Sequence, residues 1–96
     1  MQTFSHAVLF TKDDCVPCTQ TKGYIRDHVP DEYKPHLSTF RKEDHTALIT
    51  AYNIDLFPTL LLVNSEGIEV DRAVGGKKVR ACVNQFLTLI HQAKRK

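Results

Sequence analysis

The sequence predicts a small α/β domain in which three helices flank a four-stranded mixed sheet, in the order βαβαββα. Three observations lead to this prediction. The chain has 96 residues, enough for one domain with its own core and too few for two. In its first part, strand-like apolar runs alternate with helix-like segments, which favours parallel strands joined by a helix. Two further strand-like segments with a short turn between them then precede an amphipathic helix, and these add a hairpin to the sheet.

The first half of the chain contains the two strand–helix pairs. Gly23 weakens the first helix by about 1 kcal/mol relative to alanine, and the segment Val29-Pro30-Asp31-Glu32 ends it. Asn53 stands where the second helix should stop in the left-handed conformation, which asparagine tolerates well. The predicted elements are a strand at 6–11, a helix at 16–29, a strand at 36–40 and a helix at 43–52.

The second half contains the hairpin and the last helix. Residues 57–63 are apolar on both alternating faces, which indicates a central strand covered on both sides. Residues 64–67 are a turn, and 68–74 return as an antiparallel strand in which Ile68 and Val70 alternate with acidic residues. The last helix follows a Gly-Gly pair and has an apolar stripe with helical spacing, namely Val79, Cys82, Val83, Phe86, Leu87 and Ile90.

Composition and charge narrow the function classes. The apolar fraction of 42% and the charged fraction of 25% are ordinary for a globular protein. The net charge of +2 does not predict nucleic-acid binding, and residues 93–96 are expected to be a basic, frayed tail of a single domain spanning 1–96. There is no apolar run long enough for a membrane span and no signal-like segment. Three cysteines are too few for a disulfide scaffold. We therefore expect a cytoplasmic monomer that binds neither membranes nor nucleic acid.

Two of the cysteines, Cys15 and Cys18, stand where the first strand meets the first helix. In this context a Cys-x-x-Cys motif predicts a thiol–disulfide centre. The unpaired N–H groups and the dipole of a helix N-terminus stabilise a thiolate, so the pKa of the Cys15 thiol should be lowered. Lys12 should favour the thiolate further, and the two aspartates after it should oppose it. Cys18 lies one turn into the helix and should be the more buried, and Pro17 is tolerated there because the first turn needs no N–H.

Each of these residues also has an ordinary interpretation. Cys15 and Cys18 would make half of a zinc site, but Cys82 and five scattered histidines do not have the spacing of the remaining ligands. Cys82 lies on the apolar stripe and is interpreted as a small core residue. We expect no metal, and no histidine is predicted to be a catalytic base. Pro58 is also compatible with an ordinary proline at the start of a strand, and Gly75-Gly76 with a helix-entry turn.

Beside these local patterns, longer stretches resemble a known family. The segment AYNIDLFPTLLLVNSEGIEV resembles the matching part of thioredoxins, and Cys-Val-Pro-Cys places its proline as thioredoxins do. The opening LFTKDDC is similar instead to glutaredoxins, and to the small glutaredoxin-like electron donors of ribonucleotide reductase. The chain therefore resembles the thioredoxin superfamily, in the form of a thioredoxin without its N-terminal strand and helix. This resemblance implies a minimal thioredoxin, or glutaredoxin-like, fold.

The resemblance also implies roles for individual residues. Cys15 would be the attacking nucleophile and Cys18 the resolving thiol. Pro58 would be the family's cis-proline, which faces the dithiol and helps bind an extended substrate, and Gly75 would give that chain close access. The residues expected to contact the substrate are Lys12, Val16, Pro17, Phe57, Pro58, Thr59 and Gly75.

Three positions depart from these families. Asp14 replaces the thioredoxin tryptophan before the first cysteine, and the chain has no tryptophan anywhere. Leu9 stands where thioredoxins have the buried aspartate that accepts the proton of the resolving thiol. The segment GGKK lacks the acidic or hydroxyl residue with which glutaredoxins hold glutathione.

Together these features predict a thiol–disulfide oxidoreductase that reduces protein disulfides, with ribonucleotide reductase as one candidate partner. No bound cofactor is implied, and the electrons are expected from a flavin thioredoxin reductase and NADPH or, as the alternative, from glutathione. A reduction potential of about −230 to −270 mV is expected, between the glutaredoxin and thioredoxin values. Two other functions stay open, namely docking alone, as thioredoxin does when it serves as a polymerase accessory subunit, and oxidase or isomerase activity in an oxidising compartment.

Overall fold

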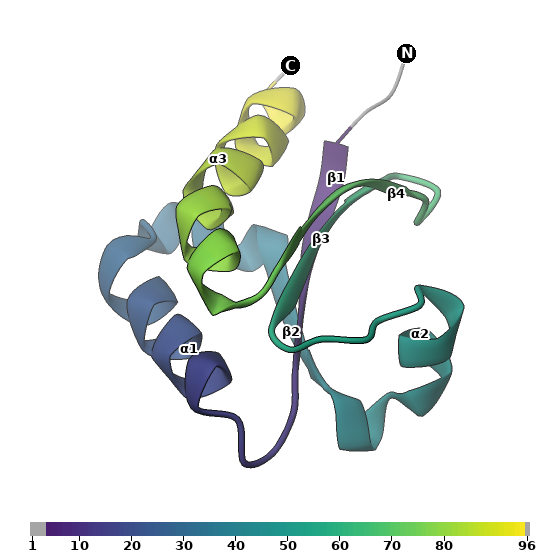
Figure 1. Cartoon of the computed structure of the whole chain (residues 1–96). Coiled ribbons are helices and arrows are strands. Elements are labelled where there is room, and N and C mark those ends of the chain that lie inside the picture. Colours follow the sequence, from purple (N-terminus) through teal and green to yellow (C-terminus); the bar gives the residue numbers. More distant parts are fainter. Residues whose placement is uncertain (1–3, 96) are drawn as a thin grey trace.

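The computed structural model describes residues 4–95, which form the predicted βαβαββα order around one four-stranded mixed sheet (Figure 1). Two short 3-10 helices, η1 and η2, are added to that order. The elements are β1 (Phe4–Thr11), α1 (Val16–His28), η1 (Asp31–His36), β2 (Leu37–Arg41), η2 (Lys42–Asp44), α2 (Thr46–Ala51), β3 (Thr59–Asn64), β4 (Glu69–Val74) and α3 (Gly76–Lys94).

The strands lie in the order β2-β1-β3-β4. β1 pairs in parallel with β2, with Ala7 opposite Leu37, and antiparallel with β3, with Leu9 opposite Leu60. β4 pairs antiparallel with β3. The last residues of β1, β2 and β4 and the first residue of β3 therefore lie at the same end of the sheet. The segments that follow or precede the strands at this end carry most of the residues that the sequence assigns to the site.

The two faces of the sheet have separate cores because successive side chains of a strand point to opposite faces. α1 and α3 cover one face and α2 the other (Figure 1). The core under α1 and α3 contains Ala7, Leu9, Ile25, Val29, Leu60, Leu62, Ala73, Val79, Val83, Phe86, Leu87 and Ile90. The core under α2 contains Phe10, Ile54, Leu61 and Val63. All six residues of β3 are buried, which confirms the prediction of a central, doubly covered strand.

Some predicted boundaries differ from the structure. The helix predicted at 43–52 is divided into η2 and the six-residue α2, because the backbone of His45 (φ −138°, ψ 48°) leaves the helical region. η1 was not predicted. Asn53 has a φ of 54°, as expected for the residue that follows a helix.

The predicted alternation of β4 is wrong at its start. Ile68 was expected to face the core, but its side chain is 55% exposed. Ile68 lies in the turn before β4, where its N–H donates to Asn64 Oδ1 (3.0 Å) and its carbonyl accepts from the Asn64 N–H (3.0 Å). The register then shifts, because Val63 pairs with Glu69 and Leu62 with Asp71, which leaves an extra residue in β4 as in a β-bulge.

At the end of the chain, α3 continues to Lys94, so residues 93 and 94 of the predicted basic tail are helical, and Lys96 lies outside the described residues. The fraying of this tail stays a prediction. Cys82 is partly buried against the core under α1 and α3, as its place in the apolar stripe predicted. Within residues 4–95, no helix is long and apolar enough to cross a membrane.

Candidate active site

Cys15 and Cys18 form a disulfide at the N-terminus of α1. Cys15 is the N-cap residue, and its Sγ accepts a hydrogen bond from the Cys18 N–H at 3.2 Å. The Cys15 carbonyl accepts the Thr19 N–H at 3.1 Å, which begins the hydrogen bonding of the helix. An N-cap side chain normally satisfies an N–H group of the first turn that has no partner within the helix. Here a sulfur atom takes this place, so the helix N-terminus acts directly on Cys15.

The two cysteines differ in burial. The residue exposure is 9% for Cys15 and 1% for Cys18. Cys15 also borders an open groove of about 640 Å³ between the loop from Lys12 and the first two turns of α1. A protein partner can therefore reach Cys15 more easily than Cys18, which agrees with the order of burial expected from the sequence.

The Phe57–Pro58 peptide faces the disulfide from the start of β3. This peptide bond is cis, as the resemblance implied. Cys15 Sγ lies 3.8 Å from the Phe57 carbonyl oxygen. The Pro58 side chain is fully buried, and the Pro58 carbonyl accepts the Gly75 N–H at 2.8 Å. This hydrogen bond joins the residue before β3 to the residue after β4, close to the cysteines.

The hydroxyl of Thr59 stabilises this loop from inside. Thr59 is 1% exposed, and its Oγ1 donates to the Leu56 carbonyl at 2.6 Å. The Thr59 hydroxyl is therefore hydrogen-bonded within the protein, and the substrate contact that the resemblance implied for this residue stays a prediction. Leu56 itself is 61% exposed and was not predicted. An apolar residue just before Phe57-Pro58 and outside any strand is the sequence signal that would have identified it.

Three exposed apolar residues belong to the segments that form the candidate site. Val16 is 69% exposed in the first turn of α1, and Val74 is 39% exposed at the end of β4. With Leu56 they are three of the four large exposed apolar residues of the described chain.

Two adjacent glycines lie where β4 meets α3, and they differ in the space around their Cα atoms. Gly75 has a φ of 91°, and a Cβ atom there would meet nothing within 4 Å, so this position is open toward solvent, as its predicted role requires. A Cβ atom on Gly76 would lie 2.9 Å from Arg80 Nη1 and 3.1 Å from Pro17 Cβ. Gly76 therefore lets the start of α3 lie directly against the first turn of α1.

The two aspartates before Cys15 have different environments. Asp13 Oδ2 pairs with Arg41 Nη1 at 2.7 Å, and Arg41 also binds Asp44 at 2.9 Å. Hydrogen bonding to Arg41 lowers the pKa of Asp44, and Arg41 in turn has a raised pKa. Asp14 is exposed and has a left-handed backbone (φ 53°). Arg41 thus offsets the Asp13 charge that was expected to oppose a thiolate, while Asp14 has no ion-pair partner within residues 4–95.

Two lysines approach the ring of Phe57. Lys12 Nζ lies 5.9 Å and Lys42 Nζ 5.6 Å from the ring centroid. Both distances are within the range of a cation–π contact. Lys12 was predicted for the site, whereas Lys42 follows β2 and is brought there by the parallel pairing of β1 with β2.

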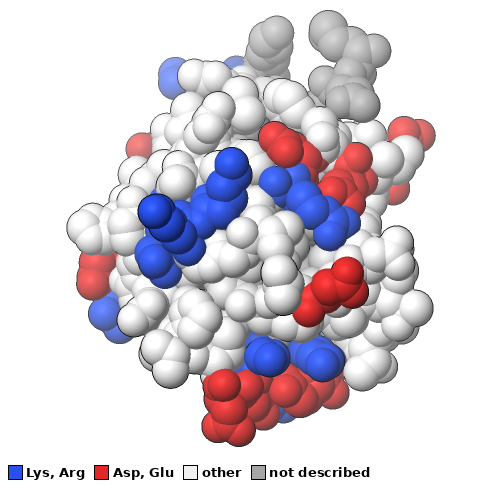
Figure 2. Space-filling view, viewed as in Figure 1, with Lys and Arg blue, Asp and Glu red and all other residues white. Residues whose placement is uncertain are grey.

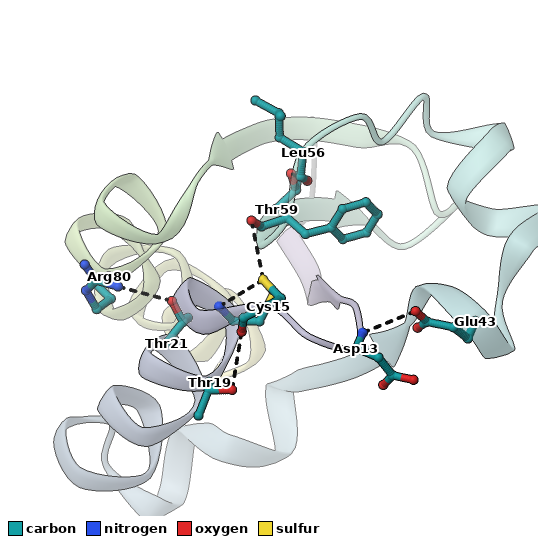
Figure 3. The surroundings of a disulfide bond; sticks show 10 residues. Asp13, Cys15, Thr19, Thr21, Glu43, Leu56, Thr59 and Arg80 are labelled. Carbon is teal, nitrogen blue, oxygen red and sulfur yellow. Dashed lines mark hydrogen bonds between the residues drawn. A yellow bond between two sulfur atoms is a disulfide. The ribbon is translucent and has the colours of Figure 1, made fainter.

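This chain has Leu9 where thioredoxins have a buried aspartate. Leu9 is fully buried in the core under α1 and α3. Thr21 is also fully buried, and its Oγ1 accepts from Arg80 Nη1 at 3.5 Å (Figure 3). Among residues 4–95, no three His, Cys, Asp or Glu side chains are grouped so that they could hold a metal ion.

Comparisons with known proteins identify the fold. No protein-family profile matches the sequence, and no curated protein matches it either. Solved structures do match. Thioredoxin from Trypanosoma brucei brucei superposes with a TM-score of 0.72 at 15% identity, over 95% of this chain and 78% of that one. Reduced Schistosoma mansoni thioredoxin pre-protein gives 0.74 at 20% identity, over 91% and 79%. Plasmodium falciparum thioredoxin gives 0.65 at 20% identity, over 86% and 82%. The chain therefore has the thioredoxin fold, with a Cys-x-x-Cys disulfide at the start of α1.

Proposed function

We propose that this protein is a thiol–disulfide oxidoreductase that reduces disulfides in other proteins. The observation that carries the proposal is the Cys15–Cys18 disulfide at the N-terminus of α1, facing the Phe57–Pro58 peptide. A purely structural disulfide would not need its less buried cysteine, Cys15, to border an open groove and to accept an N–H of the helix N-terminus at its sulfur. Both features serve a sulfur that must exist as a thiolate and meet a partner.

In the reduced protein, Cys15 would lose its proton and attack one sulfur of the partner disulfide. The new bond is the mixed disulfide between Cys15 and the partner, and the other partner sulfur leaves as a thiolate and takes up a proton. Cys18 then loses its proton and attacks Cys15 Sγ, so that the intramolecular disulfide forms and the second partner thiol is released. The partner gains two electrons and two protons, and the dithiol loses the same number.

Several of the surrounding residues have proposed parts in these steps. The Cys18 N–H, 3.2 Å from Cys15 Sγ, stabilises negative charge on that sulfur. Val16, Pro17, Phe57 and Gly75 shape the surface on which the partner segment lies. The proton of Cys18 must be accepted by water or by the departing partner thiolate, because Leu9 occupies the place of the buried aspartate of thioredoxins.

The oxidised protein must be reduced again before the next cycle. We propose a flavin disulfide reductase of the thioredoxin reductase type, with NADPH, as the source of electrons. Lys77 and Lys78 stand where glutaredoxins have the acidic or hydroxyl residue that holds glutathione, and this makes glutathione the weaker candidate. The protein is proposed to act as a monomer in the cytoplasm, with ribonucleotide reductase among its candidate partners.

The proposal is tested with two single variants of the reduced protein. Cys15→Ser should reduce a disulfide-linked reporter no faster than the background, because the attacking sulfur is absent. Cys18→Ser should instead accumulate a covalent adduct with the reporter through Cys15, detected by mass spectrometry. Cys82→Ser is the control and should leave both properties unchanged. Full activity of Cys15→Ser, or equal trapping by both active-site variants, would contradict the assignment.

The source of electrons requires a separate measurement. The oxidised protein is incubated either with thioredoxin reductase and NADPH or with glutathione, and the appearance of the Cys15 thiol is followed. Rapid reduction is expected in the first case. Equilibration with a glutathione buffer should give a potential of about −230 to −270 mV, and a value near −120 mV would identify an oxidant.

A further inference from the structure

Four lysines gather around the disulfide because of the strand order. At the end of the sheet where the disulfide lies, Lys42 follows β2, Lys12 follows β1, and Lys77 and Lys78 follow β4. The Phe57–Pro58 peptide, which immediately precedes β3, stands between the two pairs because the order is β2-β1-β3-β4. All four lysine side chains are exposed. The disulfide is therefore flanked by positive charge on both sides across this end of the sheet.

These four lysines are not neutralised within the described part of the chain. The ion pairs among residues 4–95 include none of them. Of the nearby carboxylates, Asp13 and Asp44 are bound to Arg41, and the exposed ones that have no ion pair are Asp14, Glu43 and Asp55. Figure 2 shows blue side chains in separate groups around a white area, with red side chains gathered below the lowest blue group and further red groups at the right and upper right.

The first pair of lysines lies at the ring of the residue whose carbonyl faces Cys15. Both Nζ atoms lie within 6 Å of the Phe57 ring centroid, at 5.9 Å for Lys12 and 5.6 Å for Lys42. The carbonyl of the same Phe57 is 3.8 Å from Cys15 Sγ. A partner segment that contacts the Phe57 ring beside Cys15 would therefore also meet these two ammonium groups.

The second pair belongs to a groove on the other side. This groove is lined by Val74, Gly75, Gly76, Lys77, Lys78 and Ala81. No acidic residue lies in the first turn of α3, and its N-cap residue, Gly75, has no side chain to occupy the free N–H groups. The helix dipole therefore adds to the positive potential of the two lysines.

We propose that the preferred substrate of the dithiol is a disulfide whose cysteine lies in an extended segment with acidic side chains on both sides. β2 and β4 are three interstrand spacings apart, roughly 14 Å at about 4.8 Å each, and an extended chain covers this span in about four to five residues. The acidic side chains should thus stand about two positions before and two positions after the cysteine. This inference rests on the proposed function and names its substrate class.

The test compares three symmetric disulfides, formed by the peptides Glu-Ser-Cys-Ser-Glu, Gln-Ser-Cys-Ser-Gln and Lys-Ser-Cys-Ser-Lys. Each rate constant kcat/KM is divided by the rate of reduction of the same peptide by dithiothreitol, because neighbouring charges also change the intrinsic reactivity of a disulfide. At low ionic strength the normalised value should be about tenfold higher for the acidic than for the neutral peptide, and lowest for the basic peptide. In about 0.5 M salt the preference should fall to about twofold or less.

A charge reversal at the lysines tests where the preference comes from. Lys77→Glu combined with Lys78→Glu should remove most of the preference for the acidic peptide, and adding Lys12→Glu and Lys42→Glu should reverse it. The matched control is Lys94→Glu combined with Arg95→Glu, which changes the net charge by the same amount as the first pair. These residues lie at the opposite end of the 19-residue α3, and this variant should keep the preference.

The outcomes separate this inference from the proposed function. Equal normalised rates for the three peptides would overturn the inference and leave the reductase proposal intact. An equal loss of preference in the control variant would also overturn it, because the effect would then follow net charge alone. If the reduced protein does not reduce any of the three peptides while dithiothreitol does, both the proposed function and this inference fail.

Discussion

The two faces of the sheet have cores of different size, although the same strands contribute side chains to both. On one face, α1 and the 19-residue α3 cover a large core that includes Leu60. On the other face, the six-residue α2 covers a small core that includes Leu61, the next residue of β3. Both leucines are fully buried, so the difference lies in the thickness of the layer above them.

Because of this difference, the two sides of the proposed site rest on cores of different size. Cys18, Thr21 and Ile25 are the buried residues of α1, so the helix that holds the cysteines is anchored on the large core. Phe57, whose carbonyl faces Cys15, packs instead against the small core. Regions with fewer buried apolar contacts open more easily. We infer that the sulfurs stand on the more stable face, while the loop that shapes the partner surface belongs to the more adaptable one.

The largest effect on the free energy of unfolding is expected when the two adjacent leucines are replaced by alanine, one at a time. Leu60→Ala should lower the free energy of unfolding by about 3–5 kcal/mol, because the long helices above it cannot collapse into the cavity. Leu61→Ala should cost only about 2–3 kcal/mol, because the short α2 can move inward. Urea denaturation with unchanged m values would measure both changes.

The same two variants also test the functional side of the comparison. Folded Leu61→Ala should lose more reductase activity than folded Leu60→Ala, because its cavity lies under the loop of Phe57. Equal losses of stability, or a larger activity loss in Leu60→Ala, would contradict the inference that the two faces differ in stability and in their parts in the site.

Much of this arrangement could be predicted because its signals are local. The cysteine pair and Pro17 lie in one stretch of sequence at a strand–helix junction, and the burial order of Cys15 and Cys18 follows from their positions in one helical turn. Residues 60–63, at the centre of the buried strand β3, are likewise visible as an apolar run. In each case the residues that decide the structure are close neighbours in the chain.

The features that could not be predicted depend on contacts between distant residues. Arg41 meets Asp13 across 28 positions of sequence, and only the parallel pairing of β1 with β2 brings them together. Lys42 reaches Phe57 for the same reason. The exposure of Ile68 arises from a register shift between β3 and β4, which an alternating pattern alone does not indicate.

A smaller effect is expected from Gly76, which lies where the two helices of the large core meet. In Gly76→Ala the new Cβ would approach Arg80 Nη1 at 2.9 Å and Pro17 Cβ at 3.1 Å. The arginine can rotate away, but the proline ring is held in the first turn of α1. We expect a loss of about 1–2 kcal/mol and slower disulfide reduction, measured by urea denaturation and the reporter assay.

Gly23→Ala provides the matched control for this substitution. A Cβ there would lie 3.7 Å from its nearest neighbour, Arg26 Nη2, which is an ordinary contact. Alanine is the better helix former within α1, so Gly23→Ala should stabilise the protein by about 0.5–1 kcal/mol. If Gly76→Ala were equally stabilising, the close approach of α3 to α1 would not be required.

The smallest effect concerns the pH dependence of stability at the edge of the large core. His36 Nε2 lies 3.1 Å from His91 Nδ1, a contact that joins the end of η1 to α3. Partial burial, together with the charges of Lys94 and His91, lowers the pKa of His36 below its usual 6.5. Between the folded and the unfolded pKa, the unfolded chain binds more protons, so acidification from pH 7 to pH 5 should reduce the free energy of unfolding. His36→Gln should flatten this slope, as measured by urea denaturation at several pH values. Partial burial also lowers the pKa of His6, so part of the slope should remain in this variant. An unchanged slope would show that the histidine pair does not couple pH to the packing of α3.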